Sequence, residues 1–345
     1  MKKIFQGIVL CLAFSILFFG LMISEVCAQD SKIKSMSVRI GHAAPTTDPR
    51  HLGAVEIKRV LEAESKGMIK VDVFPAGQIG GDRDLIEAAQ AGGVQIVIFP
   101  AAFLGGFQPL TSLLDVPYLF SQDSKLARKV IDGPAGDALL KTLDSVRLVG
   151  FDFWESAYKH FSANKPLRTL ADFKGLKFRV MPSDMLLTMI KCFGGSAVTF
   201  PYSEVYTGLQ TGSIDGQEAS LTSIYNMKFH EVQKFITMTY HIKSEFLVMG
   251  SKAWFDGLND ETRALVRKAV NDGAMVNAVA KKEEEEKSAG LIQKAGTKII
   301  ELTPAEIKKF QEATFQPCLD VYLKKNGDRG QKLVDIFKQE IAKAK

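Results

Sequence analysis

VQIVIFP, residues 94–100, decides the fold of this chain of 345 residues. Only Gln95 interrupts its apolar residues, and such a run is typical of a strand that is buried on both faces. The preceding residues 77–93 predict a glycine turn, a helix with Asp82 as its N-cap and a closing pair of glycines. A helix followed directly by a buried strand predicts a βαβ unit and a largely parallel sheet.

The alternation of strands and helices continues on both sides of this unit. Period-two runs indicate strands, and apolar residues three and four positions apart indicate helices. The pattern restarts after Arg147, so we expect two α/β blocks, and from about His241 the chain returns to the first block. Strands are predicted at residues 37–43, 69–75, 148–154, 173–180 and 245–251, and helices at 51–67, 185–195 and 203–212.

Two long helical segments complete the chain. One begins at Asn259 and Asp260, an N-cap candidate, and runs to about residue 296. The other begins at Thr303, which is followed by proline and glutamate at the first and third helical positions. The predicted domain I comprises residues 29–156 plus 245–284, and the predicted domain II comprises residues 157–244 plus 285–345.

The N-terminus predicts export from the cytoplasm. Two lysines precede an apolar run over residues 4–23, and Val26 and Ala28 occupy positions −3 and −1 of a signal-peptidase site. We therefore expect residues 1–28 to be a cleaved secretory signal and the mature protein to be periplasmic. An uncleaved membrane anchor is the alternative, because the apolar run is long enough to span a bilayer.

The composition excludes several classes of function. Charged residues make up 24% of the chain and the net charge is +5 without a dense basic patch, so no nucleic-acid partner is expected. The chain contains no phosphate-binding loop, no dinucleotide-binding glycine turn and no nucleophile elbow. Its five histidines lack metal-ligand spacing, so neither a metal nor a cofactor is predicted. Cys192 and Cys318 remain after cleavage of the signal and can be free or paired.

Asp215 and Glu218 are the remaining catalytic candidates. They lie three residues apart, a spacing that serves more often as a cap or a hydrogen-bond anchor than as an acid–base pair. We therefore expect a protein that is not an enzyme. An exported hydrolase that uses one of these carboxylates with a histidine is the alternative.

An arginine stands near the end of the predicted strand GLKFRV, residues 175–180. Phe178 and Val180 alternate with Lys177 and Arg179, which places the two charged side chains on one face of the strand. From this alternation alone, Arg179 is either an ordinary exposed residue or a fixed clamp for an anion.

Six stretches of the sequence together resemble one family. They are FPAGQIGGDRDLIEAAQAG, LLDVPYLF, VIDGPAG, ADFKGLKFRV, YSEVYTGLQTGSIDGQEAS and KFHEVQKFITMTYH. The chain resembles the solute-binding proteins of tripartite ATP-independent periplasmic (TRAP) transporters, the DctP-like group, over nearly its whole mature length. This resemblance implies a periplasmic-binding-protein-like α/β fold, in which two domains close on an organic anion and a long helix spans both domains.

The resemblance also implies roles for individual residues. Arg179 corresponds to the arginine that clamps the ligand carboxylate in this family, and Tyr202 to an aromatic residue that covers the ligand. Lys159 stands where the family commonly has a second arginine, and Ala219 where an asparagine that touches the ligand is usual. Lysine keeps the positive charge but lacks the planar fork of arginine, so these two departures bear on the identity of the substrate.

Four further residues are predicted near the cleft. Asp82 either faces the cleft or serves only as an N-cap, and His42 and His241 either line the cleft or are structural. Trp154 is expected to pack near the pocket. The predicted apolar wall consists of Tyr202, Tyr158, Phe153 and Trp154.

The expected function is the capture of an organic acid and its delivery to the membrane permease subunits of a TRAP transporter. A pocket with Ala219 and an aromatic wall predicts a monocarboxylate with an apolar or aromatic body, whereas Lys159 favours a ligand with a second carboxylate or a 2-oxo group. We expect a monomer. A role as the ligand-presenting partner of a sensor kinase or chemoreceptor is an alternative that gene neighbourhood would distinguish.

Overall fold

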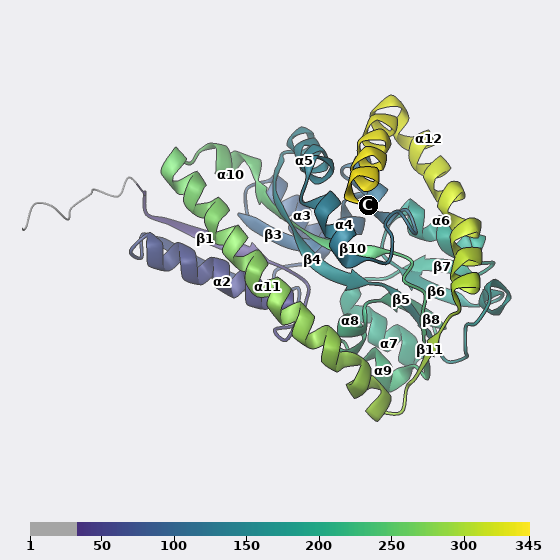
Figure 1. The fold of residues 1–345 in the computed structure, drawn as a ribbon. Helices are drawn as coiled ribbons and strands as arrows, with labels where there is room; N and C mark the ends of the chain where they lie inside the picture. The colour runs from purple at the N-terminus through teal and green to yellow at the C-terminus, as the bar shows by residue number, and fades with distance from the viewer. Residues whose placement is uncertain (1–32) are drawn as a thin grey trace, which may run out of the picture.

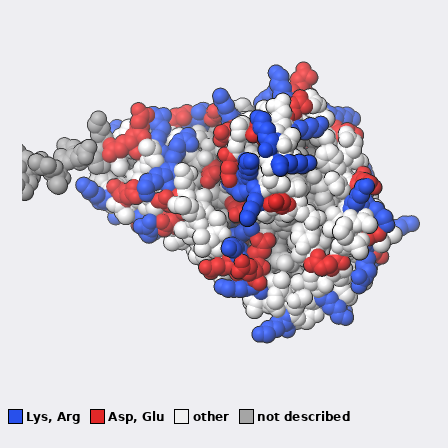
Figure 2. Space-filling view, viewed as in Figure 1, with Lys and Arg blue, Asp and Glu red and all other residues white. Residues whose placement is uncertain are grey.

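The computed structural model describes residues 33–345, and the predicted signal at residues 1–28 lies outside them. In this described part, no helix combines the length and the apolar character that crossing a membrane requires. Figure 1 shows two sheets next to each other, with the long helix α11 (Asp260–Lys294) running along both. Figure 2 shows one face of the molecule, on which positive and negative side chains are interspersed.

The first sheet is built around the apolar run at residues 94–100. Its strand order is β2-β1-β3-β10-β4, and β3 pairs with β1 on one side and with β10 on the other. Ile96 and Phe99 of β3 are fully buried, as the prediction of burial on both faces requires. The strand bounds are β1 (Met36–Gly41), β2 (Ile69–Phe74), β3 (Ile96–Pro100), β4 (Leu148–Tyr158) and β10 (Lys243–Ser251).

The second sheet has the order β11-β9-β5-β8-β6-β7. β6 carries Arg179 and lies between β7 and β8, so it is an interior strand of this sheet. Both edges of β6 are therefore hydrogen-bonded to neighbouring strands. The strand bounds are β5 (His160–Ala163), β6 (Lys177–Val180), β7 (Ser196–Thr199), β8 (Gly216–Ala219), β9 (Phe235–Met238) and β11 (Lys298–Glu301).

Both sheets are mixed, so the expected α/β fold is confirmed but the expected largely parallel sheet is wrong. β10 runs antiparallel to β3 and β4, and β5 runs antiparallel to β8 and β9. These are strands at which the chain passes between the sheets, because β4 leads directly into β5 and β9 leads into β10. A parallel pair within one sheet needs a crossover connection, usually a helix. A strand that the chain enters from the other sheet has no such connection, so the βαβ pattern does not predict whether it pairs parallel or antiparallel.

The helices that the sequence predicts begin within a residue or two of the expected positions, whereas α4, α5, α8, α9 and α10 were not predicted. Gly81 is the N-cap of α3 and Asp82 is its first residue, so the predicted N-cap is wrong by one position. The α-helices before α11 are α2 (Pro49–Glu64), α3 (Asp82–Gln90), α4 (Ser124–Ile131), α5 (Pro134–Lys141), α6 (Asp184–Cys192), α7 (Val205–Gln210), α8 (Leu221–Asn226), α9 (Phe229–Val232) and α10 (Lys252–Asp256). Short 3-10 helices lie at Ala101–Leu104, Pro109–Asp115, Thr142–Val146, Leu170–Phe173 and Tyr202–Glu204.

The last helix, α12 (Pro304–Ala344), bends at Gly327, where φ is 53°. Its first part packs on α6, and its second part returns to α4 and α5 (Figure 1). There the ring of Phe337 lies 6.2 Å from that of Phe120. The sequence-based division assigned residues 285–345 to domain II, whereas the end of α12 lies on helices that precede β4 in the chain.

The two described cysteines face the interface between α6 and α12. Cys192 is half-buried and Cys318 is buried, and both are free thiols. The Sγ of Cys318 donates to the carbonyl oxygen of Met185 at 3.5 Å. Both residues therefore act as small packing groups in this structure.

Candidate functional site

Arg179 lies near the carboxyl end of β6 with a side chain that is nearly inaccessible to solvent. It is 2% exposed, which rules out the interpretation as an ordinary exposed residue. Its Nε and Nη2 donate to the carbonyl oxygen of Phe200 at 3.2 and 3.0 Å, and its Cζ lies 5.9 Å from the centre of the Tyr202 ring. These contacts orient the guanidinium while leaving Nη1 for another acceptor.

Arg179 lines a pocket that lies between the two sheets. A ligand in this pocket contacts both units at once, which is the arrangement that domain closure around a ligand requires. The side of the first sheet contributes Arg50, Asp82, Pro100, Phe103, Ser244 and Phe246. The side of the second sheet contributes Met181, Tyr202, Glu218, Ala219, Ser220 and Ser223, and Ser156 and Lys159 lie where the chain crosses.

Lys159 is already paired inside the protein. Its Nζ lies 3.0 Å from Oε2 and 3.2 Å from Oε1 of Glu218, and the Nε2 of His241 lies 3.5 Å from the same Oε2. Burial alone would raise the pKa of Glu218, but Lys159 and His241 outweigh it and lower that pKa. Glu218 is therefore ionised, and it balances the charge of Lys159 before any ligand arrives.

Asp82 lies close to both arginines of the pocket. It is 6% exposed, and Arg50 and Arg179 both act on it electrostatically. Burial raises the pKa of Asp82, although the two guanidinium groups oppose this effect. A carboxyl group with a raised pKa beside two cations can change the charge of the pocket with pH.

We expect carboxylate affinity to fall by about tenfold as the pH rises through the pKa of Asp82. Below that pKa Asp82 is neutral, whereas above it the ionised side chain repels the ligand anion and competes for the arginines. Asp82→Asn removes this titration, so its affinity should stay flat over the pH range in which the wild-type affinity changes. Calorimetry across this range checks the expectation, with Asp328→Asn at an exposed site as the control. A flat profile for the wild type would contradict it.

Two predicted residues lie behind the pocket and do not line it. His42 follows β1 and is fully buried, with its Nε2 3.2 Å from the Nδ1 of His51. Burial, together with Arg50, lowers the pKa of His42 to about 3, so this imidazole is neutral. His241 stacks on Phe161 at 4.5 Å between ring centres and touches the pocket only through Glu218.

Trp154 packs between helices and lies away from the pocket lining. It is fully buried, and a Cβ added at Gly53 of α2 would lie 2.4 Å from its Cζ3. A Cβ added at Gly273 of α11 would lie 2.8 Å from its Cζ2. Of the predicted apolar wall, only Tyr202 lines the pocket, and the other apolar lining residues are Pro100, Phe103, Met181, Ala219 and Phe246.

Arg50 is a pocket residue that the sequence reasoning missed. It is the second residue of α2, and the N-cap of this helix is Asp48, whose side chain accepts from the backbone N–H of Arg50. The sequence Asp48–Pro49–Arg50 carries a signal for this placement, because aspartate followed by proline marks the start of a helix. That signal locates the helix but does not reveal what its first turn faces.

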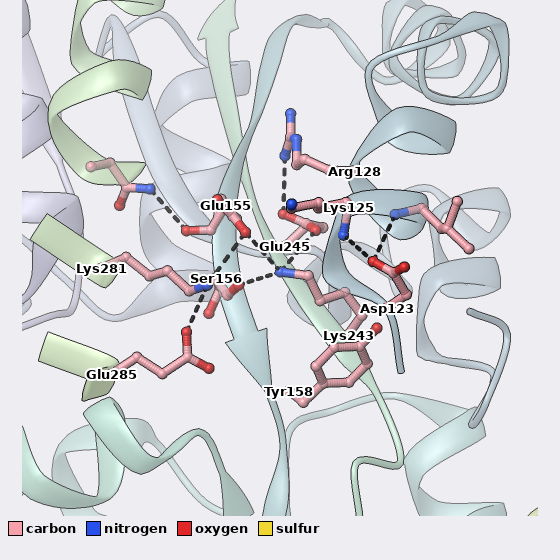
Figure 3. Close-up of polar contacts among 12 residues, drawn as sticks. Asp123, Lys125, Arg128, Glu155, Ser156, Tyr158, Lys243, Glu245, Lys281 and Glu285 are labelled. Atoms are coloured by element: carbon pink, nitrogen blue, oxygen red, sulfur yellow. Dashed lines mark hydrogen bonds and ion pairs between the residues drawn. The ribbon is translucent and has the colours of Figure 1, made fainter. Parts of the chain in front are cut away.

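Ion pairs tie together the strands that run behind the pocket (Figure 3). Lys243 of β10 donates to the carbonyl oxygen of Ser156, and its Nζ lies 3.6 Å from Oε1 of both Glu155 and Glu245. Lys281 of α11 reaches Glu155 at 3.3 Å. The network connects β4, β10 and α11 at the point where the chain leaves the first sheet, and Ser156 within it lines the pocket.

Asp215 serves as a hydrogen-bond anchor. Its Oδ2 accepts from the backbone N–H of Lys177 at 2.8 Å, which fixes the start of β6. Glu218 is held by Lys159 and His241, as described above. Neither carboxylate is therefore arranged as an acid–base pair with the other.

Known proteins similar to this chain agree with this geometry. The family described as bacterial extracellular solute-binding protein, family 7 (DctP), matches residues 40–325. The 2,3-diketo-L-gulonate-binding periplasmic protein YiaO of Escherichia coli (strain K12) is 32% identical over 309 residues, which cover 89% of this chain and 93% of YiaO. The C4-dicarboxylate-binding periplasmic protein DctP of Rhodobacter capsulatus is 32% identical over 288 residues, covering 82% of this chain and 85% of that protein.

A solved structure also matches closely. It is a TRAP periplasmic solute-binding protein from Desulfovibrio salexigens with bound orotic acid, which aligns with a TM-score of 0.87 at 32% identity. The alignment covers 90% of this chain and 99% of that one. Because the matching family consists of binding proteins, the alternative of an exported hydrolase is wrong. The chain belongs to the DctP family, the family 7 of bacterial extracellular solute-binding proteins that serve TRAP transporters.

Proposed function

We propose that this protein binds a monocarboxylate with an apolar or aromatic body and delivers it from the periplasm to the membrane subunits of a TRAP transporter. The pocket lies between two sheets joined by crossing strands, so a ligand that contacts both sides stabilises a closed form. The ligand shifts the open–closed equilibrium by its higher affinity for the closed form. The permease subunits then recognise the closed, ligand-bound form.

The charge balance of the pocket is the observation that carries this proposal. Lys159 is compensated by Glu218 and Arg50 by Asp48, whereas Arg179 donates to a backbone carbonyl. When Asp82 is protonated, which its burial favours, Arg179 is the one cation of the described lining that no protein carboxylate compensates. One carboxylate matches that charge, and a second would be buried without a counter-charge.

Apart from four serines, the remaining lining is apolar, and this apolar part favours a flat or apolar ligand body. Phe103, Met181 and Phe246 replace the predicted aromatic wall, and Ala219 offers a methyl group. The names of the similar proteins include a sugar acid, a C4-dicarboxylate and orotic acid, which share a carboxylate. Orotic acid is a flat ring with one carboxylate, the type of ligand that this lining suits.

A thermal-shift screen tests the proposal. The plate contains succinate, D-galacturonate, 2-oxobutyrate, benzoate and orotate, and a ligand at 100 times its Kd stabilises the fold by about 2.7 kcal/mol. We expect benzoate or orotate to give the largest shift. Stabilisation by succinate alone would contradict the single carboxylate, and stabilisation by D-galacturonate alone would contradict the apolar or aromatic body. Either result would make Lys159 the selectivity residue.

A further inference from the structure

Arg50 and Arg179 reach the same pocket from elements beside different sheets. It belongs to the first turn of α2, beside the first sheet, whereas Arg179 belongs to β6 in the second sheet. Both guanidinium groups line the pocket and both act on Asp82. A ligand whose carboxylate is bound by Arg179 can therefore present a second polar group to Arg50.

The guanidinium of Arg50 is fixed on several sides. Its Nε donates to Oδ1 of Asp48 at 2.9 Å and its Nη2 to Oδ2 at 3.0 Å. Its Cζ lies 4.1 Å from the centre of the Phe246 ring, which restrains the guanidinium plane. Arg50 and Asp48 are 3% and 2% exposed, so solvent does not compete for these contacts.

The pairing with Asp48 determines what Arg50 can still bind. The two parallel bonds engage Nε and Nη2 and leave Nη1 for a further acceptor. The positive charge is cancelled by Asp48, so a second anion in the pocket gains little from it. A rigid donor without net charge suits a neutral acceptor, above all a carbonyl oxygen.

Stability alone does not explain a charged pair at this position. Apolar residues of similar size replace many buried ion pairs at no loss of stability. Here the pair stands at the pocket, and its arginine is pre-organised by a helix cap, a carboxylate and an aromatic ring. Pre-organisation of this kind is typical of a group that recognises a ligand.

We propose that Arg50 determines specificity by donating a hydrogen bond from Nη1 to a carbonyl oxygen at the end of the ligand opposite its carboxylate. The ligand class is then an oxo acid: a monocarboxylate with a ketone, amide or ring carbonyl remote from the acid group. This inference rests on the proposed function, because it takes Arg179 as the group that binds the carboxylate.

Two pairs of probes of matched shape test the inference by calorimetry. 4-Oxopentanoate is compared with 4-methylpentanoate, and 4-acetylbenzoate with 4-isopropylbenzoate, so that each pair differs by a carbonyl oxygen against a methyl group. We expect the wild type to bind the oxo member of at least one pair about tenfold more tightly than its partner. Arg50→Met should abolish this preference, so that the two members of each pair bind with equal affinity.

A second variant guards against misfolding. Arg50→Met leaves Asp48 buried without its partner, so the double variant Asp48→Asn with Arg50→Met removes both charges together. It should show the same loss of preference, and Arg329→Ala, at an exposed site, should retain the preference of the wild type. Equal weakening of both members of a pair would overturn the inference, because it would show that Arg50 only maintains the pocket.

The outcomes separate this inference from the proposed function. If the wild type binds 4-methylpentanoate as tightly as 4-oxopentanoate, and the benzoates likewise, the specificity role of Arg50 is wrong and the proposed function stands. If none of the four probes and no acid of the screening plate binds, the proposed function fails and this inference fails with it.

Discussion

Replacing Arg179 with alanine is expected to weaken carboxylate binding by about 2–4 kcal/mol, roughly 30- to 1,000-fold in Kd. The variant leaves the ligand carboxylate in the pocket without Arg179, the one cation of the described lining that is not paired with a protein carboxylate. Arg50 and Lys159 cannot take over this task, because Asp48 and Glu218 already engage them. Calorimetry with the best ligand of the screen measures the loss.

Arg179→Lys separates charge from geometry. Two nitrogens of Arg179 bond to the carbonyl oxygen of Phe200 while the group faces the pocket, and a lysine ammonium cannot reproduce this planar arrangement. We expect partial recovery of affinity relative to alanine. Arg329→Ala controls for loss of a positive charge elsewhere, and affinity of Arg179→Ala equal to that of the wild type would show that the clamp assignment is wrong.

The local pattern around Arg179 explains both the success and the limit of the prediction from sequence. The alternation in residues 175–180 correctly predicted a strand, which is β6 at Lys177–Val180. It placed Lys177 and Arg179 on one face, yet Lys177 is exposed and Arg179 is buried. The difference arises from the segment at Phe200 and Tyr202, which covers the end of the strand. Such covering depends on contacts between distant parts of the chain, so periodicity cannot reveal it.

The same limit applies to the rest of the fold. β3 was predictable because its composition alone reports burial on both faces. β5, β7, β9 and β11 were missed because these short strands lack a clear alternation of their own and are defined by their partners in the sheet. The antiparallel strands β5 and β10 depend on how the chain crosses between the sheets, which no local pattern records.

The candidate site was predicted mainly by resemblance and only partly by pattern. Of the eight predicted residues, the structure brings Arg179, Lys159, Tyr202, Ala219 and Asp82 to the pocket. The family resemblance identified Arg179, Lys159, Tyr202 and Ala219, because each corresponds to a position in a family motif. Arg50 lies outside the motifs that carry the resemblance, so neither route identified it.

Trp154→Ala is expected to destabilise the fold by about 3–5 kcal/mol without removing any group that lines the pocket. The indole is fully buried between Gly53 of α2 and Gly273 of α11, which approach closely because neither carries a side chain. Removing the indole leaves a cavity that the two packed helices cannot close. Urea denaturation measures the loss, and Trp254 remains as the fluorescent probe because the chain has two tryptophans.

The milder variant Trp154→Phe separates packing from binding. It retains an aromatic ring between the helices, so we expect a smaller loss of stability and a folded protein suitable for calorimetry. Its ligand affinity should equal that of the wild type, since Trp154 is absent from the residues that line the pocket. A folded Trp154→Phe protein with tenfold weaker binding would instead restore the sequence-based expectation that this residue belongs to the pocket. Ser156 lies two residues further along β4 and does line the pocket. Unchanged affinity of Trp154→Phe would therefore show that the part of β4 that contributes to the pocket begins after Trp154.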